Sequence, residues 1–179
     1  FKYPGIRSDS DMHTMGFRFK PWTEPKTIAD GPSILKYLDE AVKENDLEEK
    51  IQFMKKVVSA KWSSTNANWN LTVRNTNNSL EETITCKILY LCGGYYNYDN
   101  GYLPEFKGYE DFEGEIIHPQ HWPEDLNYEG KKVVVIGSGA TAVTIVPAMA
   151  DKVSHITMLQ RSPTYYMSAP DERPFDSAI

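Results

Sequence analysis

The chain of 179 residues is 40% hydrophobic and 25% charged, and its formal net charge is −6 at pH 7. These values are typical of a globular protein, and they argue against nucleic acid as a partner, because binding phosphates requires a basic surface. The sequence predicts neither a transmembrane segment nor a signal peptide, and its two cysteines are too few for a disulfide framework or a metal site. We interpret Cys86 and Cys92, which share one strand pattern, as reduced packing residues, and we expect a cytoplasmic location.

The first part of the chain predicts a loop followed by one helix. Residues 1–25 are rich in Pro, Gly, Asp and aromatic residues, a composition typical of loops. A helix is expected to begin around residues 30–33, with Ser33 as its N-cap, and to end near residues 45–46. Its apolar residues recur at helical spacing: Ile34, Leu35, Leu38 and Val42. Because the sequence opens without Met and closes without a final helix or strand, we expect an internal piece of a longer protein.

The middle of the chain predicts a β-meander. Segments rich in β-branched and aromatic residues are separated by turn-forming residues, and the expected strands are 51–54, 57–62, 69–74 and 83–91. Gly93 and Gly94 should end the last strand, and residues 95–111 should connect it to the next part of the chain. We place the domain boundary in this connection, which gives domains at 1–111 and 112–179.

The second domain should begin with a βαβ unit over residues 131–162. Residues 133–136 form a continuous apolar run, which favours a strand buried on both faces. An apolar helix should extend to about residue 150, although Pro147 interrupts its hydrogen bonding, and a second strand is expected at 155–159.

A glycine-rich turn joins the first of these strands to the helix. It has the pattern GxGxxA and consists of Gly137, Ser138, Gly139, Ala140, Thr141 and Ala142. The first glycine permits a tight turn, the second lets the backbone approach a pyrophosphate, and the small third residue lets helix and strand pack closely. The helix N-terminus then offers N–H groups and a partial positive charge. An ordinary strand–turn–helix is the alternative, and the position of the turn favours a dinucleotide site.

The end of the second strand indicates which dinucleotide binds. An NAD site usually carries Asp or Glu there to hold the ribose 2′-hydroxyl, but this sequence has Arg161 and Ser162 instead. A guanidinium can bind a 2′-phosphate through two hydrogen bonds, and the Ser162 hydroxyl can donate another. We therefore predict NADPH rather than NADH. The alternative is that Arg161 is an ordinary surface arginine.

The segment before the βαβ unit carries a second motif. Phe112, Gly114, His118, Trp122 and Pro123 match every fixed position of the pattern FxGxxxHxxxW(P/D). This pattern resembles the fingerprint of Baeyer–Villiger monooxygenases, whereas the related flavin-containing monooxygenases have Phe or Tyr where Trp122 lies. Residues 3–9 are similar to the segment that follows the first FAD βαβ unit in these enzymes, and residues 8–11 and 19–22 resemble the ethionamide-activating subgroup.

This resemblance implies an α/β fold, a Rossmann-type flavoprotein that binds two dinucleotides. The chain would hold part of the FAD domain, with its β-meander, and the start of the NADPH-binding Rossmann domain. The FAD-phosphate turn would precede Phe1, and the catalytic arginine would follow Ile179. The family uses FAD and NADPH to insert one oxygen atom from O2 into a ketone or onto sulfur.

The resemblance also implies roles for individual residues. Asp9 would lie beside the flavin and the catalytic arginine, although a loop Asp that caps a turn is an equal alternative. Val57 would contact the FAD adenine or simply pack in the core. Cys92, Gly93 and Gly94 would form a degenerate version of the turn that touches the flavin. His118 would act as an acid–base group or, as we favour, couple domain motion to catalysis together with Trp122.

Two other functions stay open at this point. A disulfide reductase-like flavoprotein would need a redox pair, but Cys86 and Cys92 are six residues apart and lack a CxxC motif. The chain by itself could also be an NADPH-binding module without activity.

Overall fold

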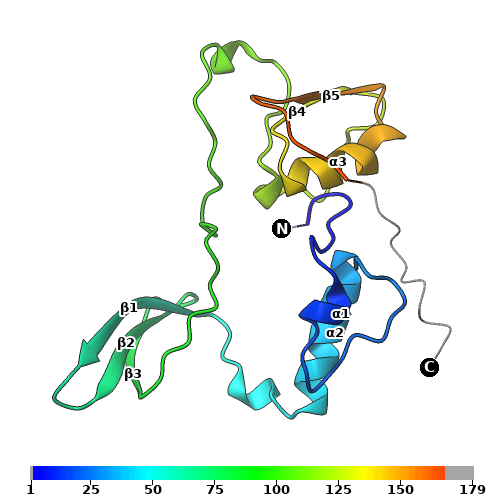
Figure 1. Ribbon diagram of the computed structural model, residues 1–179. Coiled ribbons are helices and arrows are strands. Elements are labelled where there is room, and N and C mark those ends of the chain that lie inside the picture. Colours follow the sequence, from blue (N-terminus) through cyan, green and yellow to red (C-terminus); the bar gives the residue numbers. More distant parts are fainter. Residues whose placement is uncertain (1, 168–179) are drawn as a thin grey trace. The chain divides into compact units, whose positions relative to one another are not determined.

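The structure, a computed structural model, describes residues 2–167. These residues form two compact units. The larger unit combines the residues up to Ala41 with those from Tyr98 onward, and the smaller comprises Val42–Asn97 (Figure 1). Each unit has helices or strands of its own, so each is described separately. The domain boundary near residue 111 stays a prediction.

Two helices build the core of the N-terminal part. Helix α1 spans Met12–Met15, and the Asp11 carboxylate caps it by accepting a hydrogen bond of 2.7 Å from the N–H of His13. Helix α2 spans Gly31–Glu44. The buried cluster between these elements consists of Met12, Trp22, Ala29 and Tyr37. The prediction of loop for residues 1–25 is therefore wrong at α1, a single helical turn that is too short to show an apolar periodicity.

The start of α2 also differs from the prediction. Asp30, and not Ser33, is its N-cap: the Ser33 N–H donates to the Asp30 carboxylate at 2.9 Å, and the Ile34 N–H donates to the Asp30 carbonyl at 3.1 Å. These bonds place Ser33 three residues inside the helix. The hydrogen bond from the Ser33 backbone is the main cause that lowers the pKa of Asp30, and Lys26 adds a smaller effect of the same sign.

The smaller unit contains the predicted meander. After a short 3-10 helix η1 (Glu48–Lys50), strands β1 (Lys55–Ser63), β2 (Asn68–Asn75) and β3 (Glu81–Cys86) pair antiparallel in chain order. Trp62 and Trp69 lie opposite each other at the turn between β1 and β2, with ring centroids 5.5 Å apart in an edge-to-face arrangement.

Two of the predicted strands differ in the structure. Residues 51–54 form no strand, and the predicted strand 83–91 ends at Cys86. The apolar residues that follow are exposed, with Ile88 at 84% and Leu91 at 81%. A strand needs a hydrogen-bonding neighbour as well as β-propensity, and within the described residues β3 is an edge strand with its one neighbour at β2.

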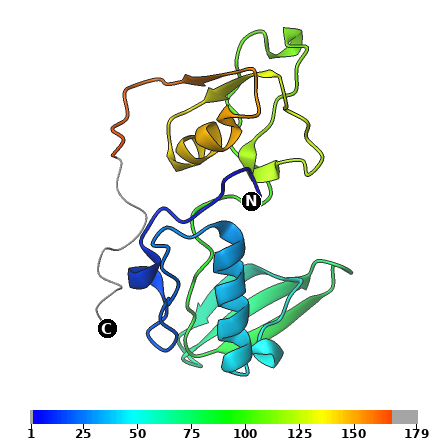
Figure 2. The same ribbon diagram turned by 90° about the vertical axis from the view of Figure 1, so that its right-hand side faces the viewer.

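The larger unit contains the predicted βαβ. Strands β4 (Lys132–Ile136) and β5 (His155–Leu159) pair in parallel, and helix α3 (Ala140–Ala150) connects them. Helix α3 packs on one face of this two-stranded sheet (Figure 2). Side chains on the opposite face are open, with Val134 at 62% exposure, so the prediction of a strand buried on both faces is wrong for the described residues.

Pro147 does not break α3. The helix continues to Ala150, and Pro147 lies on its exposed side. Pro147 has no N–H to donate to the Val143 carbonyl, so α3 lacks one helical hydrogen bond at this point. The cost of Pro147 is therefore one lost hydrogen bond. The buried side of α3 is unaffected and consists of Ala142, Thr144, Ile145 and Met149.

Candidate cofactor site

The glycine-rich turn has the backbone geometry that a dinucleotide site requires. Gly137 has φ +121°, a value that side-chain-bearing residues rarely adopt, and its N–H donates to the Leu159 carbonyl at 2.9 Å. Gly139 is the N-cap of α3, and no side chain caps the helix there. A Cβ atom on either glycine would meet no atom within 4 Å. Open space therefore lies above the helix N-terminus, whose first N–H groups lack partners within the helix.

The third small position of the turn is explained by packing. Ala142 is 6% exposed, and the helix α3 that carries it contacts both β4 and β5. A larger side chain at Ala142 would push the helix away from the strands and move the turn. The Thr144 hydroxyl, which is also buried, is satisfied by donating to the Ala140 carbonyl at 2.9 Å.

Arg161 and Ser162 follow β5 after one intervening residue, Gln160, at the same edge of the sheet as the glycine turn. Register pairing places Ile136 opposite Leu159, so the ends of both strands meet there. Both Arg161 and Ser162 are exposed, and no carboxylate lies in residues 159–162. The open turn and the exposed guanidinium at one edge fit a dinucleotide that carries a 2′-phosphate.

Thr164 and Tyr166 contact the glycine turn, an arrangement that no pattern in the sequence predicts. The Thr164 hydroxyl lies 2.6 Å from the Ser138 hydroxyl. The Tyr166 hydroxyl accepts a hydrogen bond of 3.0 Å from the Gln160 amide and lies 3.5 Å from the Ser138 carbonyl. No motif marks Thr164 or Tyr166, so pattern reasoning could not single them out.

The linker motif makes its own set of contacts. The Nδ1 atom of His118 accepts a hydrogen bond of 3.2 Å from the Gln120 N–H and so caps the short 3-10 helix η3 (Pro119–His121). A Cβ atom on Gly101 would overlap the imidazole of His118, so the backbone of Gly101 lies directly against this ring. These two contacts hold the His118 ring in place.

The other fixed positions of the motif also pack against partners. A Cβ on Gly114 would come within 2.6 Å of the Phe112 ring, so only glycine fits beneath that ring without a shift. Trp122 meets Tyr128 edge-to-face, with centroids 6.0 Å apart. Pro123 follows, and its carbonyl accepts a hydrogen bond of 3.4 Å from the Leu126 N–H.

The residues predicted to contact FAD are not brought together within either unit. Asp9 is exposed and lies in the larger unit. Val57, which is 52% exposed and adjoins a β-bulge, lies in the smaller unit with Cys92, Gly93 and Gly94. Neither unit alone therefore forms an FAD site from these residues, and their roles stay predictions.

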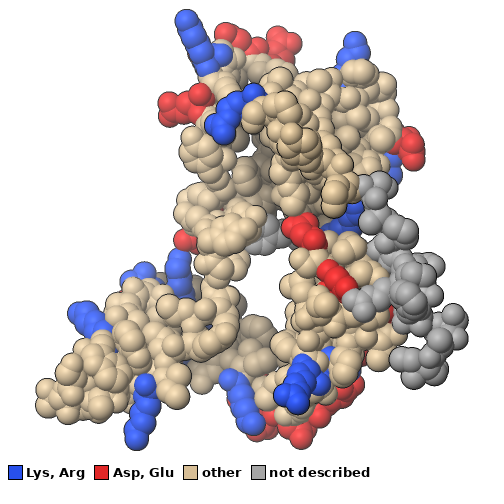
Figure 3. Space-filling view, viewed as in Figure 1, with Lys and Arg blue, Asp and Glu red and all other residues tan. Residues whose placement is uncertain are grey.

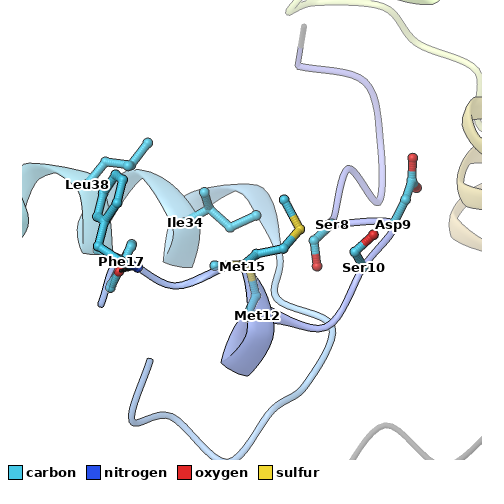
Figure 4. A pocket seen from close by; sticks show the side chains of 9 residues that line it. Ser8, Asp9, Ser10, Met12, Met15, Phe17, Ile34 and Leu38 are labelled. Atoms are coloured by element: carbon cyan, nitrogen blue, oxygen red, sulfur yellow. Dashed lines mark hydrogen bonds between the residues drawn. The ribbon is translucent and has the colours of Figure 1, made fainter. Parts of the chain in front are cut away.

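Asp9 borders a hollow of about 390 Å³ in the larger unit. Figure 4 shows apolar side chains of α1 and α2 along it, and Ser8, Asp9 and Ser10 together at one end. The lining is mostly apolar: Met12, Met15, Phe17, Ile34, Tyr37 and Leu38. In this view the Asp9 carboxylate points away from the methionines.

Other site types have little support in the described part of the chain. Within residues 2–167, no group of three or more His, Cys, Asp or Glu side chains could hold a metal ion, and no helix is long and apolar enough to cross a membrane. On the face shown in Figure 3, Lys and Arg side chains are scattered among acidic ones and form no broad basic area.

The prediction that both cysteines are packing residues of one strand is wrong for Cys92. Both thiols are free, but Cys92 is exposed and lies outside β3, whereas Cys86 ends that strand. The two residues therefore do not share one strand, and Cys92 is not a packing residue in this structure. Neither cysteine supports a reductase-type redox pair.

A family model described as flavin-binding monooxygenase-like matches residues 21–177. The chain is 58% identical over 171 residues to the FAD-containing monooxygenase EthA of Mycolicibacterium smegmatis, with 95% of this chain and 34% of that protein covered. It is 53% identical over 171 residues to the probable FAD-binding monooxygenase AlmA of an Acinetobacter species, again with 95% of this chain and 34% of that protein covered. The chain thus spans about a third of the length of these curated relatives.

Solved structures of similar fold are flavoprotein monooxygenases. Cyclohexanone monooxygenase from Rhodococcus, bound to NADP+, matches with a TM-score of 0.77 at 30% identity, over 98% of this chain and 33% of that one. The complex of OTEMO with FAD and NADP matches with a TM-score of 0.71 at 29% identity, over 90% of this chain and 31% of that one. The α/β, Rossmann-type flavoprotein fold is confirmed by these matches.

Proposed function

The chain belongs to the flavin-binding monooxygenase-like family, and on this premise we propose that it works within an FAD-containing, NADPH-consuming monooxygenase. That enzyme inserts one oxygen atom from O2 into a ketone or adds it to sulfur. The observation that carries the proposal is the open glycine turn beside Arg161, where an NAD site would have a carboxylate. The NADP-bound cyclohexanone and steroid monooxygenases support the choice of cofactor.

In this proposal the βαβ unit holds NADPH. The turn from Gly137 to Ala142 and the N-terminus of α3 bind the pyrophosphate, and Arg161 with Ser162 binds the 2′-phosphate. Bound NADPH supplies electrons, and bound FAD supplies the reaction with O2. The protein contributes position and electrostatic stabilisation around them.

The remaining motif residues support the cofactors indirectly. We assign Asp9 and the Cys92–Gly94 turn to the flavin side of the reaction centre, and Val57 to the adenine side of FAD. We assign His118 and Trp122 to the linker, as positioning residues, because the His118 imidazole caps η3 and packs on Gly101. A cytoplasmic location stays our expectation for the enzyme.

A ketone is the substrate class with the more direct support. Related solved structures include cyclohexanone monooxygenase bound to cyclohexanone and to ε-caprolactone, a ketone and the corresponding lactone. O2 uptake and product analysis with cyclohexanone and with a thioether would separate ketone insertion from sulfur oxidation. Conversion of neither compound, in an enzyme that holds both cofactors, would contradict the assigned reaction.

The cofactor assignment is tested by calorimetric titration of the full-length protein with NADPH and NADH. NADPH should bind more tightly, and Arg161→Ala should reduce that preference roughly 10- to 100-fold, since hydrogen bonds to charged groups contribute about 1.5–3 kcal/mol. Arg18→Ala is a matched control, because Arg18 is an exposed arginine outside the βαβ unit. Equal affinities in the wild type, or a preference that survives Arg161→Ala, would overturn the assignment.

A further inference from the structure

The segment from Gln160 to Tyr166 is a small loop closed by its own hydrogen bond. The Gln160 side-chain amide donates to the Tyr166 hydroxyl at 3.0 Å and so joins the two ends of the loop. The same hydroxyl lies 3.7 Å from the sulfur of Met158, which belongs to β5. Arg161 and Ser162 lie inside this closed loop.

The loop is also attached to the glycine turn at two points. Thr164 and Ser138 share a hydrogen bond of 2.6 Å between their hydroxyls, and the Tyr166 hydroxyl lies 3.5 Å from the Ser138 carbonyl. Ser138 is the residue between the two glycines of the turn. The loop that carries Arg161 and the turn that would receive the pyrophosphate are therefore held together through one residue.

Two neighbouring tyrosines show that this arrangement is specific. Tyr165 is 98% exposed, whereas Tyr166 is 47% exposed and lies against Gln160, Met158 and Ser138. Tyr166 is therefore about half buried, whereas Tyr165 is not. The hydroxyl contacts and this partial burial distinguish Tyr166 from Tyr165.

Holding the loop matters because of the chemistry of arginine. An arginine side chain loses considerable rotamer freedom when it binds a ligand, and binding improves when the surrounding backbone is already in place. The hydrogen bond between Gln160 and Tyr166 joins the ends of the loop, and the contacts with Ser138 attach it to the turn. These contacts therefore keep the distance between the Arg161 backbone and the pyrophosphate position fixed. That distance is what a dinucleotide with a 2′-phosphate must match.

We propose that Thr164 and Tyr166 are positioning residues that hold the Arg161 loop against the glycine turn and thereby set the preference for NADPH over NADH. This proposal rests on the proposed function, because it assumes that Arg161 binds the 2′-phosphate. Neither residue needs to touch the cofactor. Their effect is transmitted through Ser138 and the loop backbone.

The test compares Tyr166→Phe and Thr164→Val with Tyr165→Phe in the full-length protein. Calorimetric titrations with NADPH, NADH and adenosine 2′-monophosphate give three dissociation constants for each variant, and thermal unfolding checks the fold. Tyr166→Phe should lower the NADPH-to-NADH preference on the order of fivefold, as expected for loss of one hydrogen bond, and weaken adenosine 2′-monophosphate binding similarly. Thr164→Val should act in the same direction, and Tyr165→Phe should change none of these values.

The outcomes separate this proposal from the proposed function. If Arg161→Ala removes the preference but Tyr166→Phe and Thr164→Val leave it intact, the positioning role is overturned and the NADPH assignment stands. Equal losses for NADPH and NADH in these variants would also overturn it, since they would indicate general destabilisation. If the wild type shows no preference at all, both proposals fail.

Discussion

The βαβ unit and the segment after the meander are both apolar, yet only one of them has its predicted structure. Strand β4 pairs with β5 and is covered on one face by α3, all within 28 residues, Lys132–Leu159. Residues 87–91 follow β3 as an exposed, non-strand segment. Apolar composition therefore predicts a strand correctly only where the hydrogen-bonding partner and the covering helix lie close in the sequence.

The same difference applies to the cofactor residues. The residues proposed to bind NADPH lie on one turn and one strand end, which parallel pairing brings to the same edge. The residues predicted for FAD lie in two units that the structure describes separately. A site made of local elements can be assembled from this chain, whereas a site made of distant segments stays a prediction.

The largest expected difference in stability is between substitutions at a buried residue of α3 and at an exposed residue after β3. Met149 in α3 is 2% exposed, so Met149→Ala should lower the free energy of unfolding by about 2–5 kcal/mol. Leu91 is 81% exposed, so Leu91→Ala should change it by less than about 0.5 kcal/mol. Urea unfolding of both variants measures the difference. A comparable loss for Leu91→Ala would show that the segment after β3 is buried in solution.

Substituting one glycine in each region compares the two regions by their effect on NADPH binding. Gly137→Ala should place a side chain at φ +121°, which costs about 1–3 kcal/mol and should weaken NADPH binding roughly tenfold. Gly93 has open space around it and no positive φ, so Gly93→Ala should leave NADPH binding unchanged. Fluorescence titration with NADPH reports both. An unchanged affinity for Gly137→Ala would argue against a pyrophosphate at this turn.

A smaller loss of stability is expected when the N-cap of α2 is removed. This cap is a contact between Asp30 and Ser33, which are three residues apart. Asp30→Ala should lower the free energy of unfolding by about 1 kcal/mol at neutral pH. Hydrogen bonding from Ser33 lowers the pKa of Asp30 below its ordinary value of 3.8, so this stabilisation is complete above that pH. It should be lost as the pH falls through the lower folded-state pKa.

The control for this prediction is Asp30→Asn, which keeps an oxygen acceptor for the Ser33 N–H but removes the titrating group. Chemical unfolding at neutral and acidic pH would be compared for the wild type and both variants. Asp30→Asn should retain most of the neutral-pH stability. A wild-type advantage over Asp30→Ala that is equally large in strong acid would contradict the role of the carboxylate.

How far the sequence predicts this structure depends on the distance between interacting residues. The GxGxxA turn, α3 and β5 are encoded in consecutive residues, and their positions follow from periodicity and glycine spacing. The N-cap of α2 was assigned to Ser33 rather than Asp30, because both residue types are good caps and only the backbone geometry distinguishes them.

Contacts between distant residues left no signal in the sequence. Gly101 lies against the His118 ring, but a single glycine in a loop does not reveal what packs on it. The contacts of Thr164 and Tyr166 with Ser138 span 26 and 28 residues, and no spacing rule connects such positions. These are contacts that only the folded chain brings together.

A crystal structure of the full-length protein with NADP+ bound would test the central claim most directly. We predict the pyrophosphate at the N-terminus of α3, above Gly137 and Gly139, and the 2′-phosphate hydrogen-bonded to the Arg161 guanidinium. A 2′-phosphate bound by other residues, with Arg161 pointing into solvent, would contradict the account.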